Sequence, residues 1–309
     1  MLNRKYRYLI ALSREKHFGR AAASCNVSPS TLSAAISDLE NEIGYAVVER
    51  GKQFSGFTPE GLLLLDYALR VSDSLTTLEQ ELSARRGKLT GHLRIGVIPT
   101  ALTAIAFLSE LFYKKYPEVT LEVLSHSTTD ILNRLTKFEL DAGIIYQGES
   151  YAESLTLTPL WQEPHVLITP ATGQFKGRTS ATWEEASKLR LCLLTPDMKN
   201  RQIIDSIFRA AGCEVHPHLE TNAIVSILAH TATGVWSSIL PKSVIEMIGA
   251  PQGTVALPLT QPTRTWEIGL ATLKRDPMPP ILTALIDEAK HLNESFDKNE
   301  QSFDKIHFL

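Results

Sequence analysis

Four hydroxyl side chains lie close together in the sequence, at Ser28, Ser30, Thr31 and Ser33. Ser28 suits the N-cap of a helix, and Pro29 suits the first helical position, where no backbone donor is needed. Small hydroxyls let a helix approach phosphates and base edges closely. A helix start also attracts phosphate through its dipole and its free N–H groups. The chemistry that this cluster offers is therefore nucleic-acid binding, although such hydroxyls can also form a plain solvated face.

Helices and a turn must position these hydroxyls. Leu32, Ile36, Leu39 and Ile43 form one apolar stripe and Gly44 supplies a stop, which predicts a helix with one buried face. Before that helix, residues 19–25 are predicted to form a short helix whose small side chains permit a close crossing, and residues 26–27 form the turn. Together they predict a helix-turn-helix.

A wing is predicted after this helix, because residues 47–50 and 56–58 resemble two short strands joined across a basic tip. Arg50 and Lys52 at the tip, and Arg20 in the first short helix, would add phosphate contacts. Each of these cations is by itself an ordinary surface charge.

This order of residues resembles the LysR-type bacterial transcription regulators, which are winged helix-turn-helix proteins with a C-terminal ligand-sensing domain. The resemblance rests on Phe18, Ala21, Ala22, Val27-Ser28, Leu32-Ser33, Ile36, Leu39-Glu40, Gly44, Glu49-Arg50 and Thr58-Pro59-Glu60-Gly61. The chain departs from the family where Pro29-Ser30 replaces the common Gln-Pro and where Ala34-Ala35 replaces a basic or amide pair. The expected DNA contacts are Arg20, Ser28, Ser30, Thr31, Ser33, Arg50 and Lys52, with DNA shape contributing to recognition.

Composition is compatible with this interpretation. The 309 residues suggest about two domains of roughly 150 residues each. The net charge is −3, but residues 1–58 hold eight basic and five acidic side chains, so they carry +3 and the rest carries −6. We find no stretch of about 18 apolar residues and no signal peptide, and we expect a cytoplasmic protein that does not contact a membrane. The cysteines at positions 25, 192 and 213 lack metal-ligand spacing, and a redox switch between Cys192 and Cys213 stays open.

A dimerisation helix is predicted at residues 59–87, with a hinge at 88–91. Leu64, Ala68, Val71, Leu75, Leu78 and Leu82 are spaced 4, 3, 4, 3 and 4 apart, as in a helix that pairs with a second helix. The alternative is packing against the chain's own sensor domain. Pairing predicts a homodimer or homotetramer that binds double-stranded promoter DNA at two related half-sites.

The remainder, residues 92–293, is predicted to be α/β with a largely parallel sheet, because strand and helix patterns alternate. The first lobe comprises residues 92–161 and 266–293, the second lobe residues 162–265, and residues 294–309 form a poorly ordered tail. This layout is similar to the periplasmic-binding-protein-like effector domain of the LysR type, which implies a small-molecule effector between the lobes.

Polar residues at strand ends and helix starts are the candidate effector contacts. We expect a helix from Thr100 to Tyr116 whose start faces the cleft. The candidates are Thr100, Ser127, Thr128, Thr195, Met198, Arg201, Thr221, Asn222 and Trp236. Each Ser or Thr is also a plausible N-cap, and Trp236 either narrows the cleft or fills the core.

The first domain and Trp236 also resemble LysR-type proteins associated with formate dehydrogenase genes, which implies a small carboxylate such as formate. The residue chemistry alone does not identify it. An enzyme is disfavoured, because we find no phosphate loop, nucleophile elbow or metal spacing, and we expect no cofactor and no metal. A DNA-binding protein without a ligand remains an alternative, and RNA polymerase is a further candidate partner.

Overall fold

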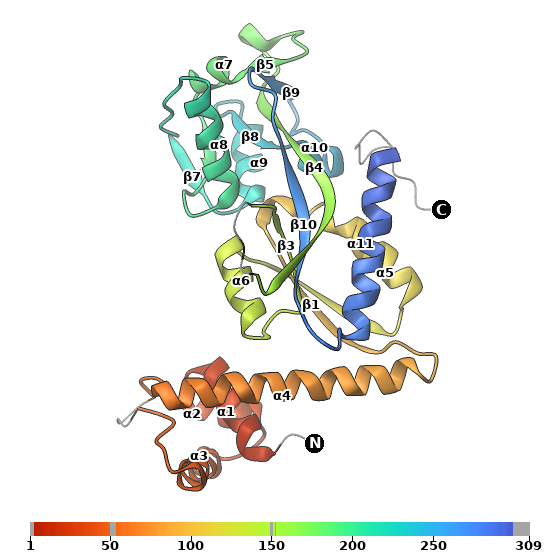
Figure 1. Ribbon diagram of the computed structural model, residues 1–309. Helices are drawn as coiled ribbons and strands as arrows, with labels where there is room; N and C mark the ends of the chain where they lie inside the picture. The colour runs from red at the N-terminus through yellow and green to blue at the C-terminus, as the bar shows by residue number, and fades with distance from the viewer. Residues whose placement is uncertain (1–2, 50–53, 149–150, 152, 299–309) are drawn as a thin grey trace. The chain divides into compact units, whose positions relative to one another are not determined.

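The computed structural model describes residues 3–49, 54–148, 151 and 153–298 (Figure 1). The chain divides into two compact units, Met1–Gly87 and Lys88–Leu309. The tip of the predicted wing, with Arg50 and Lys52, lies outside the described residues.

The described part of the first unit contains four helices, α1 (Arg4–Glu15), α2 (Phe18–Ser24), α3 (Pro29–Ile43) and α4 (Pro59–Ala84). Ser28 caps α3 by accepting a hydrogen bond from Thr31 N at 3.1 Å, and Gly44 ends it with φ 75°. The small side chains of Ala21 and Ala22 are fully buried and allow α2 to cross α3 closely. The core of this unit is completed by Tyr8, Leu9, Leu12, Leu32, Ile36 and Leu39.

The wing is held to the helices by two polar contacts and a close approach. Val48 forms an antiparallel bridge with Phe57. Glu40 Oε1 accepts hydrogen bonds from the backbone N–H groups of Val47 and Val48, at 2.7 and 3.1 Å. A Cβ at Gly61 would lie 2.0 Å from Val47 O, so only glycine lets α4 begin against the wing strand. The carboxylate of Glu40 therefore fixes the wing to α3.

The second unit is built on an eight-stranded sheet of order β2-β1-β3-β10-β4-β9-β5, with β8 paired to β4. Only the pairs β1–β2, β1–β3 and β5–β9 in it are parallel, so the predicted largely parallel sheet is wrong for the central strands. The strands are β1 (Gly91–Val97), β2 (Val119–Ser125), β3 (Ala142–Tyr146), β4 (Leu155–Pro170), β5 (Ala181–Thr182), β8 (Ser238–Pro241), β9 (Thr254–Thr260) and β10 (Thr265–Leu273); β6 (Cys192–Leu194) and β7 (Leu219–Thr221) pair separately.

Two lobes share this sheet, because β4 and β10 run through both of them (Figure 1). The first lobe carries α5 (Ile105–Lys115), α6 (Thr128–Thr136) and α11 (Pro280–Lys298), and the second carries α7 (Trp183–Ser187), α8 (Lys199–Ala210), α9 (Ile224–Ala232) and α10 (Lys242–Ile248). The predicted tail at 294–309 begins too early, since α11 continues to Lys298, where Phe296 is fully buried against Trp161.

Glycines bring α6 close to the sheet. A Cβ at Gly96 would lie 3.0 Å from Cγ1 of Ile131 on α6, and one at Gly143 would lie 2.4 Å from Cγ2 of the same residue. The start of α6 therefore sits beside the end of β1. The predicted helix from Thr100 is wrong in its first turn, where Pro99–Ala101 is a 3-10 helix and α5 begins only at Ile105.

Candidate functional site

The hydroxyl cluster at the start of α3 is exposed. Ser28, Ser30, Thr31 and Ser33 all face solvent, while Leu32 between them is fully buried. Ser28 Oγ lies 2.8 Å from both Ser30 Oγ and Thr31 Oγ1, so these hydroxyls form one hydrogen-bonded group around the helix start. Such a group presents both donors and acceptors to a phosphate or a base edge.

Arg20, the predicted contact on α2, is exposed but held in place. Its Nη2 donates to Glu15 O at 2.6 Å and its Nε lies 3.5 Å from Glu15 Oε2. His17 caps α2 by accepting from the N–H groups of Gly19 and Arg20. Phe18 packs against Phe54 at 6.1 Å between ring centroids, which ties α2 to the base of the wing.

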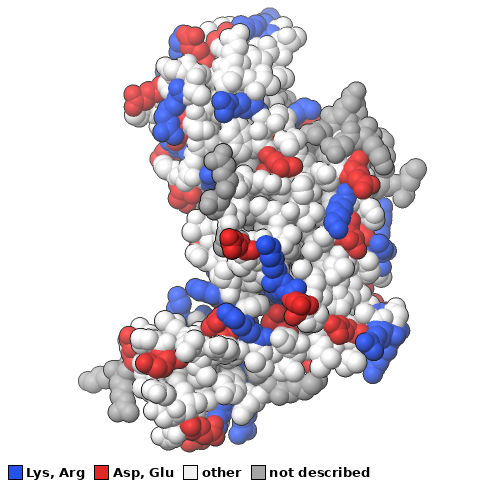
Figure 2. Space-filling view, viewed as in Figure 1, with Lys and Arg blue, Asp and Glu red and all other residues white. Residues whose placement is uncertain are grey.

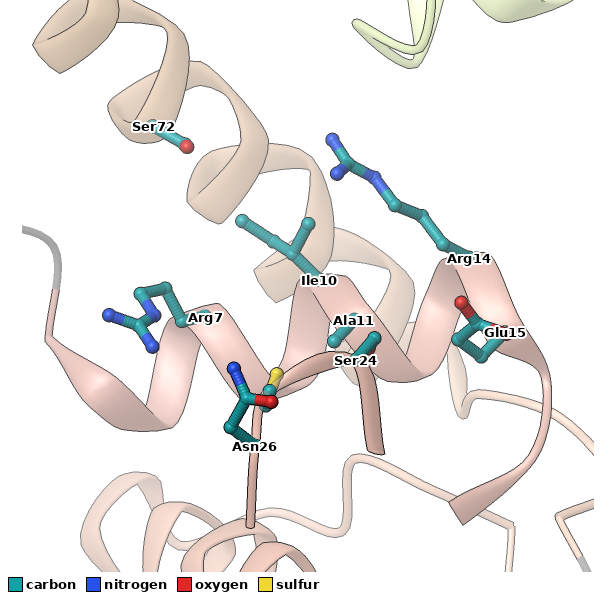
Figure 3. Close-up of a pocket in the computed structure, with 9 residues that line it drawn as sticks. Arg7, Ile10, Ala11, Arg14, Glu15, Ser24, Asn26 and Ser72 are labelled. Atoms are coloured by element: carbon teal, nitrogen blue, oxygen red, sulfur yellow. The ribbon is translucent and has the colours of Figure 1, made fainter. Parts of the chain in front are cut away.

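A groove of about 370 Å³ opens between α1, the turn after α2, and α4 (Figure 3). Arg7 and Arg14 line it from α1, Asn26 from the turn and Ser72 from α4. The sequence did not indicate this groove. Its two arginines add positive charge to the unit that carries α3, whereas the face in Figure 2 as a whole shows cations and anions interspersed.

One face of α4 presents apolar side chains to solvent. Leu63, Tyr67, Val71, Leu78 and Leu82 are 43–61% exposed and form what we call the outward stripe. The predicted pairing residues divide between the two faces: Val71, Leu78 and Leu82 lie on the stripe, Leu64 and Leu75 are half-buried, and Ala68 is buried. The sequence spacing missed Leu63 and Tyr67, because each lies one residue before a pattern position, Leu64 and Ala68.

A small cavity lies between the two lobes of the second unit and contains about 10 Å³ of free volume. We call it the interlobe cavity. Space of this size is close to the least that accommodates one water molecule. Its polar lining comes from Thr100, Ser127, Thr128 and Tyr146 of the first lobe and from Lys199 and Asn200 of the second, with Ile98, Pro99, Leu194 and Met198 beside them.

Hydrogen bonds join the two lobes at the cavity wall. Asn200 Nδ2 donates to Tyr146 Oη at 3.0 Å and lies 3.0 Å from His165 Nε2, and Thr100 Oγ1 lies 3.2 Å from Tyr146 Oη. Asn200 Oδ1 and Thr128 Oγ1 are buried without a hydrogen-bond partner. Lys199 is half-buried and has no ion-pair partner among the described residues. The cavity thus offers one cation and several unused polar atoms to a small ligand.

Four of the nine predicted effector residues line this cavity, namely Thr100, Ser127, Thr128 and Met198. Ser127 also caps α6, accepting from Asp130 N at 3.2 Å. The sequence did not single out Tyr146, Lys199 or Asn200. Lys199 and Asn200 begin α8, a signal that was available, but their proximity to Tyr146 depends on how the lobes pack.

The other five predicted effector residues do not line the cavity: Thr195, Arg201, Thr221, Asn222 and Trp236. Arg201 is engaged elsewhere, with Nε 2.8 Å from Asp205 Oδ1 and Nη1 2.6 Å from Glu220 Oε1. Thr221 Oγ1 accepts from Ala223 N at 3.3 Å. Trp236 packs beside the apolar cluster of Val166, Ile168 and Leu240, as the core-filling alternative requires.

Burial favours the neutral forms of two histidines and a tyrosine near the cavity. Burial lowers the pKa of His165 to about 4 and raises that of Tyr146 well above its ordinary value. Burial also lowers the pKa of His126, which precedes Ser127. Among the described residues, no group of three or more His, Cys, Asp or Glu side chains is arranged to hold a metal ion. No helix in the same part of the chain is long and apolar enough to cross a membrane.

Comparisons with known proteins match both units. Residues 3–62 match the family described as bacterial regulatory helix-turn-helix proteins, lysR family, and residues 86–293 match the LysR substrate binding domain. A hydrogen peroxide-inducible genes activator of Escherichia coli O157:H7 is 26% identical over 300 residues, which cover 96% of this chain and 97% of that protein.

Solved structures share the fold over nearly the whole chain. A full-length OxyR variant from Pseudomonas aeruginosa superposes with a TM-score of 0.75 at 27% identity, covering 93% of each chain. Full-length CbnR complexed with its target DNA has a TM-score of 0.67 at 19% identity and covers 94% of this chain and 99% of its own.

Proposed function

Because the two family matches together span residues 3–62 and 86–293, the chain belongs to the lysR family and is a DNA-binding transcriptional regulator rather than an enzyme; we propose that a very small anion bound in the interlobe cavity controls it. The anion is proposed because Lys199, a cation without an ion-pair partner among the described residues, lies beside a cavity with room for little more than water. Acting on chromosomal DNA, such a regulator works in the cytoplasm.

The start of α3 is the part that we assign to the major groove. Its hydroxyl group at Ser28, Ser30, Thr31 and Ser33 is exposed, and the cap leaves the helix dipole directed at a phosphate. Arg20, together with the wing residues Arg50 and Lys52, would neutralise nearby phosphates. Small hydroxyls make few bidentate base contacts, so DNA shape would supply part of the specificity.

The outward stripe of α4 is assigned to pairing with a second copy. Five large apolar side chains along one helix are a costly surface to leave in water, at about 25 cal/mol per Å² of apolar area. Pairing would place two α3 helices on one duplex. A homotetramer formed by further contacts between second units, and contact with RNA polymerase, belong to the same proposal.

The anion is assigned to the cavity by charge and by size. Lys199 would supply a charge-assisted hydrogen bond, and Asn200, Thr100 and Thr128 would supply neutral ones. Because the cavity has room for about one water molecule, even the smallest organic anion would require the lobes to part slightly, and a larger ligand would require a wider opening. Formate, the smallest carboxylate, is therefore the first candidate. The ligand changes the regulator only if it binds one lobe arrangement more tightly than another.

Calorimetry of the full chain tests this assignment. We expect formate to bind with 1:1 stoichiometry, acetate to bind more weakly, and a neutral molecule of similar size such as formamide not to bind. Promoter DNA affinity measured with and without formate should then differ. Equal binding of formate and formamide would contradict an anionic effector.

A response to hydrogen peroxide is the second candidate, since the relative from Escherichia coli O157:H7 is named for it. The described lining of the cavity contains no cysteine, and burial raises the pKa of Cys192 to about 11. A thiol reacts with peroxide when it is accessible and ionised. We therefore expect peroxide to leave promoter binding unchanged. A peroxide-induced disulfide between Cys192 and Cys213, detected by mass spectrometry, would favour this candidate instead.

A further inference from the structure

Glu163 carries a carboxyl group that is buried between the lobes. The proposed anion contacts do not include it. It lies on β4 and has no exposed surface. Ser243 Oγ donates to its Oε1, and Trp161 Nε1 lies 3.4 Å from the same oxygen. Its Oε2 has no hydrogen-bond partner. A buried carboxylate is very costly without a cation or several donors, so this environment favours the neutral acid.

Tyr146 connects Glu163 to the interlobe cavity. The tyrosine lines the cavity, and its hydroxyl interacts electrostatically with the Glu163 carboxyl. The same hydroxyl accepts from Asn200 Nδ2 at 3.0 Å and lies 3.2 Å from Thr100 Oγ1. A charge placed in the cavity therefore acts on Glu163 across one buried side chain, where screening by water is weak.

Among the described residues, no opposite charge compensates Glu163. On its own strand His165 is neutral near pH 7, because burial lowers its pKa to about 4. On β3 the raised pKa of Tyr146 keeps the phenol neutral. The charged groups on the other packed elements have partners of their own. Lys242 pairs with Glu246 on α10, and Glu288 of α11 pairs with Lys115 and His291. Glu267 of β10 lies opposite Gln162, one strand position away from Glu163.

Resting on the proposed anionic effector, we propose that Glu163 determines the charge of what the cavity accepts: a monoanion enters together with one proton, which Glu163 takes up from solvent. In this step the anion, the Glu163 carboxylate and one proton from solvent give the bound anion beside a neutral Glu163 acid. The only bond that forms is the O–H bond of the acid. Without that proton, two negative charges would face each other through Tyr146.

The pH dependence of anion affinity follows from the pKa of Glu163. Burial raises the pKa of Glu163 to about 7, so the group is roughly half ionised in the empty protein at pH 7. Below pH 7 the acid is already protonated, and anion affinity should be constant. Above pH 7 each bound anion needs a proton, and the affinity should fall by up to about tenfold per pH unit.

Calorimetry of the full chain with formate and with nitrate, between pH 6 and 9, tests the proposal. We expect uptake of close to one proton per anion above pH 8, measured by repeating titrations in buffers with different ionisation enthalpies. Glu163→Gln should bind both anions with an affinity that does not change with pH. Anion binding without proton uptake, or an unchanged pH slope in Glu163→Gln, would overturn the proposal while leaving an anionic effector intact.

His126 supplies the matched control, since a protonated histidine beside Ser127 would also favour an anion at low pH. His126→Gln should keep the decrease of anion affinity with pH above pH 7.

A second measurement, of thermal stability, needs no ligand. The raised pKa means that Glu163 loses stabilisation as pH rises from about 4.5 to 7, so Glu163→Gln should gain in Tm relative to the natural protein over that window. Parallel Tm curves would reject a buried titrating carboxyl, and absence of anion binding at every pH would reject the effector class as well.

Discussion

At the scale of single residues, two cations at the start of α8 have different surroundings. Lys199 lines the interlobe cavity and has no ion-pair partner in the described chain, whereas Arg201 is 6% exposed and bonded to Asp205 and Glu220. The side chains are two positions apart, and consecutive helix positions point about 100° apart, so they face different neighbours. Position relative to the cavity, and not charge alone, distinguishes the proposed ligand contact from the structural ion pairs.

Substituting these two cations should therefore have different effects. Lys199→Gln should weaken formate binding about tenfold, because it removes one charge-assisted hydrogen bond, and leave Tm unchanged. Arg201→Gln should lower stability by about 1–3 kcal/mol, because Glu220 and Asp205 lose their partner. Calorimetry and thermal unfolding separate the outcomes, with exposed Lys188→Gln as the control. Normal anion affinity in Lys199→Gln would remove the main support for an anionic effector.

The start of α3 offers a substitution that separates folding from DNA binding. Thr31→Glu places a glutamate three residues after the Ser28 cap, which forms a capping box and suits the positive end of the helix dipole. The fold should be kept, while the new charge repels phosphate and lowers promoter affinity roughly 10- to 100-fold. Asn41→Glu, near the other end of α3, is the matched control. Electrophoretic mobility shifts at fixed salt measure both, and equal affinities would refute the assignment of α3.

At the scale of elements, α4 carries two apolar faces with different partners. Ala68 is buried on the face that packs against α1, while the outward stripe remains exposed. Because apolar residues occupy both the face that packs against α1 and the outward stripe, the sequence of α4 fits an a/d pattern only approximately. The spacing therefore selected residues from both faces, and of these only Val71, Leu78 and Leu82 are exposed in the single chain.

Leu78→Glu tests the stripe. Leu78 is 43% exposed in the single chain, so a glutamate there should leave the unit folded. Buried in a paired helix, the same charge would be strongly destabilising, and the dimer should dissociate at micromolar concentration. Sedimentation velocity measures the change, and exposed Thr76→Glu on another face is the control. A Leu78→Glu protein that remained dimeric would show that another surface holds the two copies together.

At the scale of the whole molecule, the proposed pairing places two α3 helices on one duplex. DNA selected from genomic fragments should contain two related half-sites, separated by whole turns of about 10 base pairs. Inserting 5 base pairs between them should weaken binding far more than inserting 10, because only the first insertion turns one half-site to the opposite side. Footprinting would detect this, and equal loss for both insertions would argue against paired recognition.

Local physics explains what could be read from the sequence alone. The limits of α3, its Ser28 cap and its Gly44 stop follow from interactions within a few residues, and the structure has all three. The winged helix-turn-helix followed by a two-lobed α/β domain was also predictable, because apolar periodicity reports which face of each element is buried.

The tertiary structure alone decided which polar groups meet. Tyr146, Lys199 and Asn200 come from distant segments and converge only because β4 and β10 join the lobes. The mixed strand directions, the engagement of Arg201 and the burial of Glu163 depend on the same packing. Contacts between residues far apart in the chain leave no local spacing pattern, and this is the physical reason that the sequence indicated four cavity residues but not the cation and the amide opposite them.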